Sequence, residues 1–114
     1  MKRGEVWWGS PTLPGGSRKR RPFLVVSNDA FNQNGLYPKV LVVHLTSVRR
    51  GTSYPWEVAL PRGTAGLDTG CVVKCAEVYT LLKIHLHEAA GTVPRRYMEQ
   101  VEEALAVSLG LAPV

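Results

Sequence analysis

The sequence predicts a small, mainly β fold that is followed by one C-terminal helix. Five short runs of apolar, β-branched and aromatic residues alternate with segments rich in glycine, proline and asparagine. After the last run, one segment carries apolar residues at helical spacing. Short strands, interspersed loops and a closing helix indicate a strongly bent β-barrel of five or more strands. The 114 residues fit a single domain over positions 1–114 and are too few for two.

The first half of the chain supplies three of these strands, predicted over residues 4–8, 23–27 and 40–47. Gly9-Ser10-Pro11 ends the first strand, and the three glycines and two prolines of residues 9–20 predict a long mobile loop. Residues 28–38 are expected to form a loop with at most a short helical turn. The continuous apolar run of the third strand predicts burial on both faces.

The second half supplies two more strands, predicted over residues 56–60 and 71–81, and the helix. Pro94 suits the first helical turn, and Gly110 ends the helix. One apolar stripe recurs at three- and four-residue steps and consists of Met98, Val101, Leu105 and Leu109.

Positive charge is concentrated in the first half. Residues 1–50 hold nine Lys and Arg against two acids, a net +7, and residues 51–114 hold five against seven, a net −2. This asymmetry predicts a basic face for a polyanion, although a basic solubilising surface would look the same. We expect a cytoplasmic protein with no membrane contact, because the apolar runs are too short for a signal peptide or a membrane helix.

A run of four cations, residues 18–21, leads directly into the second strand. Pro22 biases Arg21 towards an extended backbone, so this guanidinium is held at the start of a buried strand and can be directed at a phosphate. Thr46, late in the third strand, offers a hydroxyl as a further donor, although a threonine there is also an ordinary strand residue. Metal-free RNA cleavage requires such donors around a charged phosphorane.

Motifs along essentially the whole chain resemble those of the MazF/PemK toxin family. They are Gly4-Glu5-Val6-Trp7-Trp8, Arg21-Pro22-x-Leu24-Val25-Val26-Ser27-Asn28, Leu45-Thr46-Ser47, Tyr54-Pro55-Trp56-Glu57-Val58, Gly66-Leu67, Val101-x-x-Ala104-Leu105 and Leu109-Gly110-Leu111. The resemblance implies an SH3-like barrel that forms a homodimer. It also implies the toxin of a toxin–antitoxin system, a sequence-selective endoribonuclease that cleaves single-stranded RNA such as mRNA without a metal or cofactor. A small antitoxin protein is the implied partner.

The resemblance assigns catalysis to Arg21 and Thr46. Arginine is effectively always protonated, so Arg21 is expected to stabilise the phosphorane and not to act as a base. Neighbouring side chains of an extended chain point to opposite sides, so only Arg21 of the basic run is expected to face the site. The expected RNA contacts are Arg18, Lys19, Arg20, Ser47, Arg49, Arg50 and Glu77, with sequence selectivity in loops 9–20 and 48–53.

Two positions depart from the family pattern. Glu77 stands where relatives commonly have a glutamine, and its carboxylate would repel phosphate, pair with Arg21 or accept a proton. His44 shares a strand face with Thr46, which allows either a packed, hydrogen-bonded histidine or a part in proton transfer.

Other residue types leave alternatives open. Cys71, Cys75, His85 and His87 do not have the spacing of common zinc sites, and the two cysteines are expected to be buried free thiols. The aromatic residues suited to stack on bases, or to fill a core or dimer interface, are Trp7, Trp8, Tyr54, Trp56 and Tyr79. The alternative functions are a CcdB-like toxin that binds a protein such as gyrase and an RNA-binding barrel without catalysis.

Overall fold

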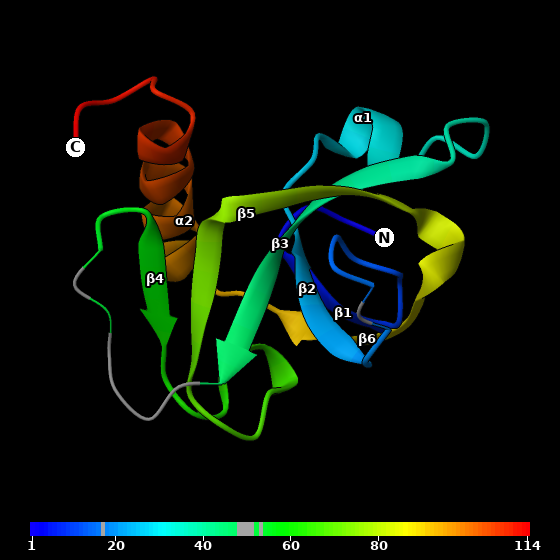
Figure 1. The fold of residues 1–114 in the computed structure, drawn as a ribbon, viewed down its shortest axis with the longest axis horizontal. Coiled ribbons are helices and arrows are strands. Elements are labelled where there is room, and N and C mark those ends of the chain that lie inside the picture. Colours follow the sequence, from blue (N-terminus) through cyan, green and yellow to red (C-terminus); the bar gives the residue numbers. More distant parts are fainter. Residues whose placement is uncertain (17, 48–51, 53) are drawn as a thin grey trace.

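Among the residues that the structure describes, the fold is a six-stranded antiparallel sheet with two α-helices and two 3₁₀ turns (Figure 1). The computed structural model describes residues 1–16, 18–47, 52 and 54–114. The strands are β1 (Glu5–Gly9), β2 (Arg21–Val25), β3 (Lys39–Ser47), β4 (Glu57–Leu60), β5 (Cys71–Leu82) and β6 (Leu86–Thr92). The helical elements are α1 (Asp29–Asn32), η1 (Thr64–Gly66), η2 (Lys83–His85) and α2 (Arg95–Ser108).

The strand order β4-β5-β3-β2-β1-β6 confirms a mainly β fold with a C-terminal helix. The sheet is strongly bent, with β4 and β6 as its two edges, so in the described part of the chain strand pairing leaves the barrel open. The turn η1 packs against β6 instead. A Cβ atom at Gly66, which has a φ of +75°, would overlap the carbonyl oxygen of Ala90, so only glycine allows this close approach.

The core consists of two apolar clusters, one between the sheet and α2, and a second that includes Phe23 and Val25 and no residue of α2. Strand β3 is buried from Val42 to Leu45, as its apolar run predicts. Helix α2 packs beside β4 and β5 and buries Met98, Val101 and Ala104. Leu109 was wrongly assigned to the buried stripe and is 63% exposed, because α2 ends at Ser108.

One further sequence prediction is confirmed, and one strand was missed. The helical turn expected in residues 28–38 is α1, and Asn28 caps it by accepting a hydrogen bond from the Ala30 backbone N–H. Strand β6 was not predicted, although it pairs with β1 along most of its length. None of the described helices is long and apolar enough to cross a membrane.

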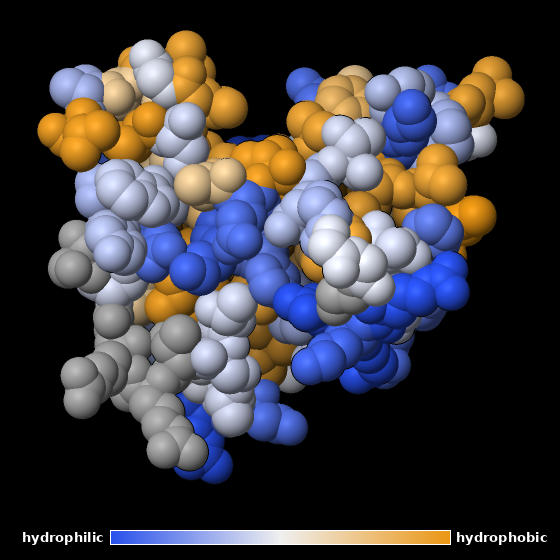
Figure 2. Space-filling view, in the orientation of Figure 1, coloured by the Kyte–Doolittle hydropathy of each residue, from blue (hydrophilic) through white to orange (hydrophobic). Residues whose placement is uncertain are grey.

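The face in Figure 2 carries hydrophilic and hydrophobic patches. Figure 2 shows strongly hydrophilic surface over β1, β2 and the segment between them, and hydrophobic surface at the C-terminal end of α2. The exposed apolar side chains at that end of the chain are Leu109, Leu111 and Val114.

Candidate active site

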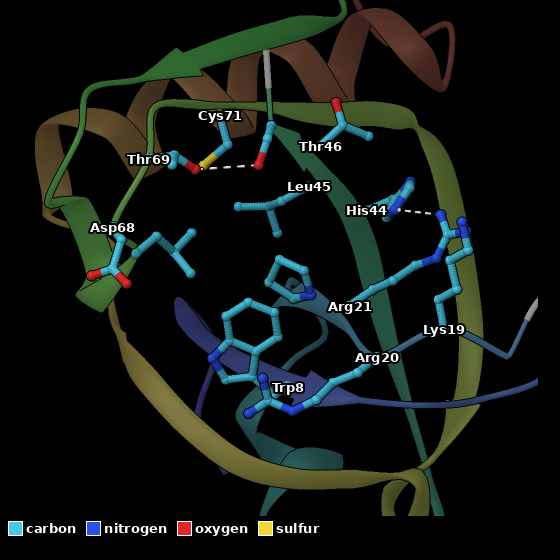
Figure 3. Close-up of a pocket in the computed structure, with 13 residues that line it drawn as sticks. Trp8, Lys19, Arg20, Arg21, His44, Leu45, Thr46, Asp68, Thr69 and Cys71 are labelled. Atoms are coloured by element: carbon cyan, nitrogen blue, oxygen red, sulfur yellow. Dashed lines mark hydrogen bonds between the residues drawn. The ribbon is translucent and has the colours of Figure 1, made fainter. Parts of the chain in front are cut away.

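A pocket of about 700 Å³ opens where β2 and β3 meet the loop before β5 (Figure 3). Its walls come from four parts of the chain, namely the end of β1, residues 19–22, the last residues of β3, and residues 67–71. The lining residues are Trp8, Lys19, Arg20, Arg21, Pro22, His44, Leu45, Thr46, Ser47, Leu67, Asp68, Thr69 and Cys71. The pocket therefore combines cations, hydroxyl groups, a carboxylate, a histidine and the indole ring of Trp8.

Arg21 and Thr46 are brought together in this pocket, although 24 positions separate them in the sequence. Arg21 is the first residue of β2 and lies opposite Gly9 of β1, so pairing fixes its backbone. Thr46 lies opposite Val72 near the end of β3. The Thr46 hydroxyl is buried and has no hydrogen-bond partner among the residues that the structure describes. A buried hydroxyl of this kind can donate a hydrogen bond to a ligand in the pocket.

His44 lies between Arg21 and Glu77. The Arg21 Nη1 atom is 3.2 Å from His44 Nε2, and His44 Nδ1 is 3.9 Å from the Glu77 carboxylate. Only 7% of His44 is exposed, and its ring lies 6.0 Å from that of Phe23. Burial lowers the pKa of His44, with Arg21 and Lys74 acting in the same direction and Glu77 opposing them. His44 and Thr46 share a face, as strand alternation predicts.

An irregularity in the pairing of β3 with β5 brings Glu77 to His44. Val43 pairs with Val78, but the next residue, His44, pairs with Lys74, so three residues of β5 have no counterpart in β3. Glu77 is one of these extra residues. Such a bulge redirects side chains, and here it turns a carboxylate towards the histidine.

Arg20, the cation directly before β2, contacts a partly buried ring and an exposed carboxylate. The Arg20 guanidinium lies 4.2 Å above the centre of the Trp8 ring, and its Nη2 atom is 3.2 Å from the Glu88 carboxylate. Both contacts join it to neighbouring parts of the sheet. Arg20 therefore also lines the pocket, contrary to our prediction that only Arg21 would face it. Strand β2 begins only at Arg21, so strict alternation does not extend to Arg20.

The remaining predicted contact residues differ in their placement. Lys19 and Ser47 line the pocket, whereas Arg18 is an exposed residue outside the lining and donates from Nε to the Thr12 hydroxyl over 2.7 Å. Arg49 and Arg50 lie outside the described residues.

The loop before β5 forms a wall that the sequence analysis missed. Asp68 and Thr69 line the pocket, and the Thr69 hydroxyl lies 3.2 Å from the Ser47 hydroxyl (Figure 3). These groups accept and donate hydrogen bonds and can contact the edges of a base. The Gly66-Leu67 motif was the only sequence signal near them.

The aromatic and cysteine residues separate into different environments. Trp8 lines the pocket, whereas Trp7 packs against an apolar cluster on the other side of β1. Tyr54 and Trp56 stack on each other with 5.0 Å between their ring centres. Cys71 and Cys75 are buried free thiols, as predicted, and burial raises the pKa of both, that of Cys75 to about 12. Neither thiol is prepared to act as a nucleophile at neutral pH.

The sequence matches a known protein family. Residues 2–109 match the family model described as PemK-like, MazF-like toxin of type II toxin–antitoxin systems. The chain is 34% identical over 113 residues to endoribonuclease MazF6 of Mycobacterium tuberculosis, covering 97% of this chain and 98% of that protein. It is 27% identical over 113 residues to endoribonuclease EndoA of Bacillus subtilis, covering 97% and 96%.

Solved structures show the same fold. An endoribonuclease in complex with its cognate antitoxin, from a mycobacterial species, superposes with a TM-score of 0.80 at 30% identity, covering 98% of this chain and 97% of that one. A MazE–MazF structure from Deinococcus radiodurans superposes with a TM-score of 0.74 at 29% identity, again covering 98% and 97%. The match extends over nearly the whole chain in each case.

Proposed function

Because the chain belongs to the family of PemK-like, MazF-like toxins of type II toxin–antitoxin systems, we propose that it cleaves single-stranded RNA as a sequence-selective endoribonuclease. Relatives that align over nearly their full length bear the name endoribonuclease. Unpaired RNA suits the pocket, because only unpaired bases can splay into a cavity and be read at their edges.

The observation that carries this proposal is that Arg21 and Thr46 line the same pocket. The guanidinium offers two parallel donors to phosphate oxygens, and the buried Thr46 hydroxyl offers another. Donors fixed in a partly buried site stabilise developing negative charge more strongly than solvent does.

The reaction uses the groups of the RNA, these donors and solvent water. The ribose 2′-oxygen attacks the adjacent phosphorus, and the bond from phosphorus to the 5′-oxygen breaks. The 2′-hydroxyl loses its proton to water and the departing 5′-oxygen takes one from water, so that a cyclic phosphate and a 5′-hydroxyl result. Arg21 stabilises the phosphorane and donates near the leaving oxygen, and Thr46 assists it.

The other pocket groups guide the RNA. Lys19 and Arg20 lie beside Arg21 and can contact flanking phosphates, and Arg18 extends this basic stretch outside the pocket. Trp8 presents a ring on which a base can stack, next to the Arg20 guanidinium.

The proposal extends to the partners. An acidic, extended segment of a cognate antitoxin would bind the same cations, and a solved relative is in complex with its cognate antitoxin. We also propose a homodimer in the cytoplasm, which the family resemblance supports.

The test is cleavage of a long RNA by purified protein in EDTA, with mapping of the cut ends. Arg21→Ala is expected to abolish cleavage while the protein stays folded by circular dichroism. Thr46→Val should slow cleavage about 10- to 100-fold. It should keep or raise the free energy of unfolding, because it removes a buried hydroxyl that has no partner among the described residues.

The alternatives give different results. RNA binding without any cleavage by the wild-type protein would identify a binding module, and neither binding nor cleavage would support a toxin directed at a protein. Full cleavage by folded Arg21→Ala would overturn the assignment of the pocket.

A further inference from the structure

We propose that His44 is a positioning residue, which accepts a hydrogen bond from Arg21 and holds its guanidinium towards the pocket, while Glu77 orients the imidazole ring. This inference rests on the proposed function of the pocket.

The geometry places the three groups in series. Arg21 Nη1 lies 3.2 Å from His44 Nε2, and His44 Nδ1 lies 3.9 Å from Glu77 Oε2. The dashed line in Figure 3 joins the Arg21 guanidinium to the His44 ring across the wall of the pocket. His44 sits on a strand that is paired on both sides, with Phe23 opposite it on β2 and Lys74 opposite it on β5. The ring is therefore a rigid support.

The position of the proton on the His44 ring follows from its contact with Arg21, which can only donate hydrogen bonds. Arginine has only N–H groups to offer, so His44 Nε2 can interact favourably with it only through its lone pair. The ring proton is then on Nδ1, which faces the Glu77 carboxylate. A distance of 3.9 Å is too long for a direct hydrogen bond, so Glu77 acts on the ring through its charge or through a bridging water.

This arrangement argues against His44 as the general base. The lone pair that would accept a proton from the RNA 2′-hydroxyl is already directed at Arg21. His44 therefore affects the reaction through the guanidinium of Arg21. A guanidinium that can rotate would present its fork to the phosphate in only part of its orientations, which lowers the rate without removing the charge.

Protonation of His44 would break the support. The charged groups that face it are Arg21 on β2 and Lys74 and Glu77 on β5, and Lys19, Arg20 and Asp68 line the same pocket. Burial lowers the pKa of His44 below its ordinary value of 6.5, so the ring is neutral at pH 7. As the pH falls through this lowered pKa, an imidazolium forms against Arg21 and the hydrogen bond is lost. Cleavage should therefore fall on the acidic side.

The experiment compares His44→Gln with His44→Asn in single-turnover cleavage between pH 5 and 8. The amide oxygen of glutamine reaches the place of Nε2 and can accept from Arg21, whereas asparagine reaches only the place of Nδ1. His44→Asn should be slower by about 10- to 100-fold at pH 7.5, the effect of misplacing a reacting group by about 1 Å. His44→Gln should recover most of that loss and should lack the decrease at acidic pH.

The matched control is His87→Gln, because His87 is exposed on β6 and lies outside the pocket lining. It should keep the acidic decrease of the wild-type protein. If His44→Asn and His44→Gln are equally slow, or if either keeps the acidic decrease, the positioning role is wrong. If the wild-type protein itself does not cleave RNA, the proposed function fails instead.

A further measurement does not depend on activity. Nitrogen chemical shifts of the His44 ring at pH 7.5 should show a proton on Nδ1 and a bare Nε2. In Arg21→Ala the pKa of His44 should rise, because a nearby positive charge is removed. A proton on Nε2, or an unchanged pKa, would overturn the inference.

Discussion

Arg21 and Arg20 are neighbours in sequence, but the structure holds them in different ways. Arg21 belongs to a paired strand and donates to a histidine that is 7% exposed. Arg20 precedes the strand, lies over Trp8 and pairs with the exposed carboxylate of Glu88. Surface ion pairs are weak and easily exchanged, whereas a hydrogen bond inside the protein fixes an orientation. Arg21 is therefore held in one orientation, whereas Arg20 can exchange its present partners for phosphates.

The sharpest test of this difference replaces each arginine with lysine, which keeps the charge and removes the planar fork. Arg21→Lys should lower the single-turnover cleavage rate about 100- to 1,000-fold, as expected when a fixed donor to a developing charge is lost. Arg20→Lys should lower it less than about threefold, because an ammonium can still contact phosphate. Similar losses in the two variants would mean that the structure does not separate the roles of these residues.

A smaller effect is expected in RNA binding. Arg20→Gln should weaken binding of a 2′-O-methyl RNA, which cannot be cleaved, about 3- to 10-fold at low salt and flatten the salt dependence by about 0.7 in the log–log slope. The rate at saturating RNA should fall far less than the affinity. Fluorescence anisotropy at several salt concentrations measures the first effect.

The control for Arg20→Gln is Arg62→Gln, the same change of charge at an exposed residue outside the pocket lining. It should change affinity and slope much less. Equal weakening by both variants would show that only net charge matters, and a loss in rate without a loss in affinity would place Arg20 in the chemistry.

The different placement of Arg20 and Arg21 could be predicted from the sequence only in part. Pro22 and the apolar run after it correctly predict a cation fixed at the start of a strand, and the strand face shared by His44 and Thr46 is likewise predictable. That Arg20 also reaches the pocket was not predicted, because alternation was applied to Arg20, which lies one residue before the start of β2. Strand boundaries depend on pairing with distant segments, which local patterns do not record.

Three features that the sequence did not predict have the same kind of cause. Strand β6 pairs with β1 through two register shifts, so its residues show no regular alternation of apolar and polar side chains. The meeting of Glu77 with His44 depends on the extra residues of β5, whose position is set by two strands together. Likewise, Asp68 and Thr69 reach the pocket because η1 packs against β6.

The smallest expected effect concerns the carboxylate behind the fixed cation. The charge of Glu77 raises the pKa of His44 against the larger lowering by burial. Glu77→Gln should therefore lower that pKa further, so that the acidic decrease in cleavage moves to lower pH and the rate at pH 7.5 changes little. Removing a negative charge near the RNA should also strengthen RNA binding slightly.

The same substitution in the His44→Gln background separates the two effects of Glu77. With no imidazole to titrate, Glu77→Gln should leave the pH profile of cleavage unchanged and keep only the gain in RNA affinity. This result would show that the shift of the acidic decrease in the single variant arises from the interaction between Glu77 and His44. A decrease that moves to higher pH in the single variant, or a shift that persists without His44, would show that Glu77 acts on another titrating group. In that case the support of Arg21 would consist of His44 alone.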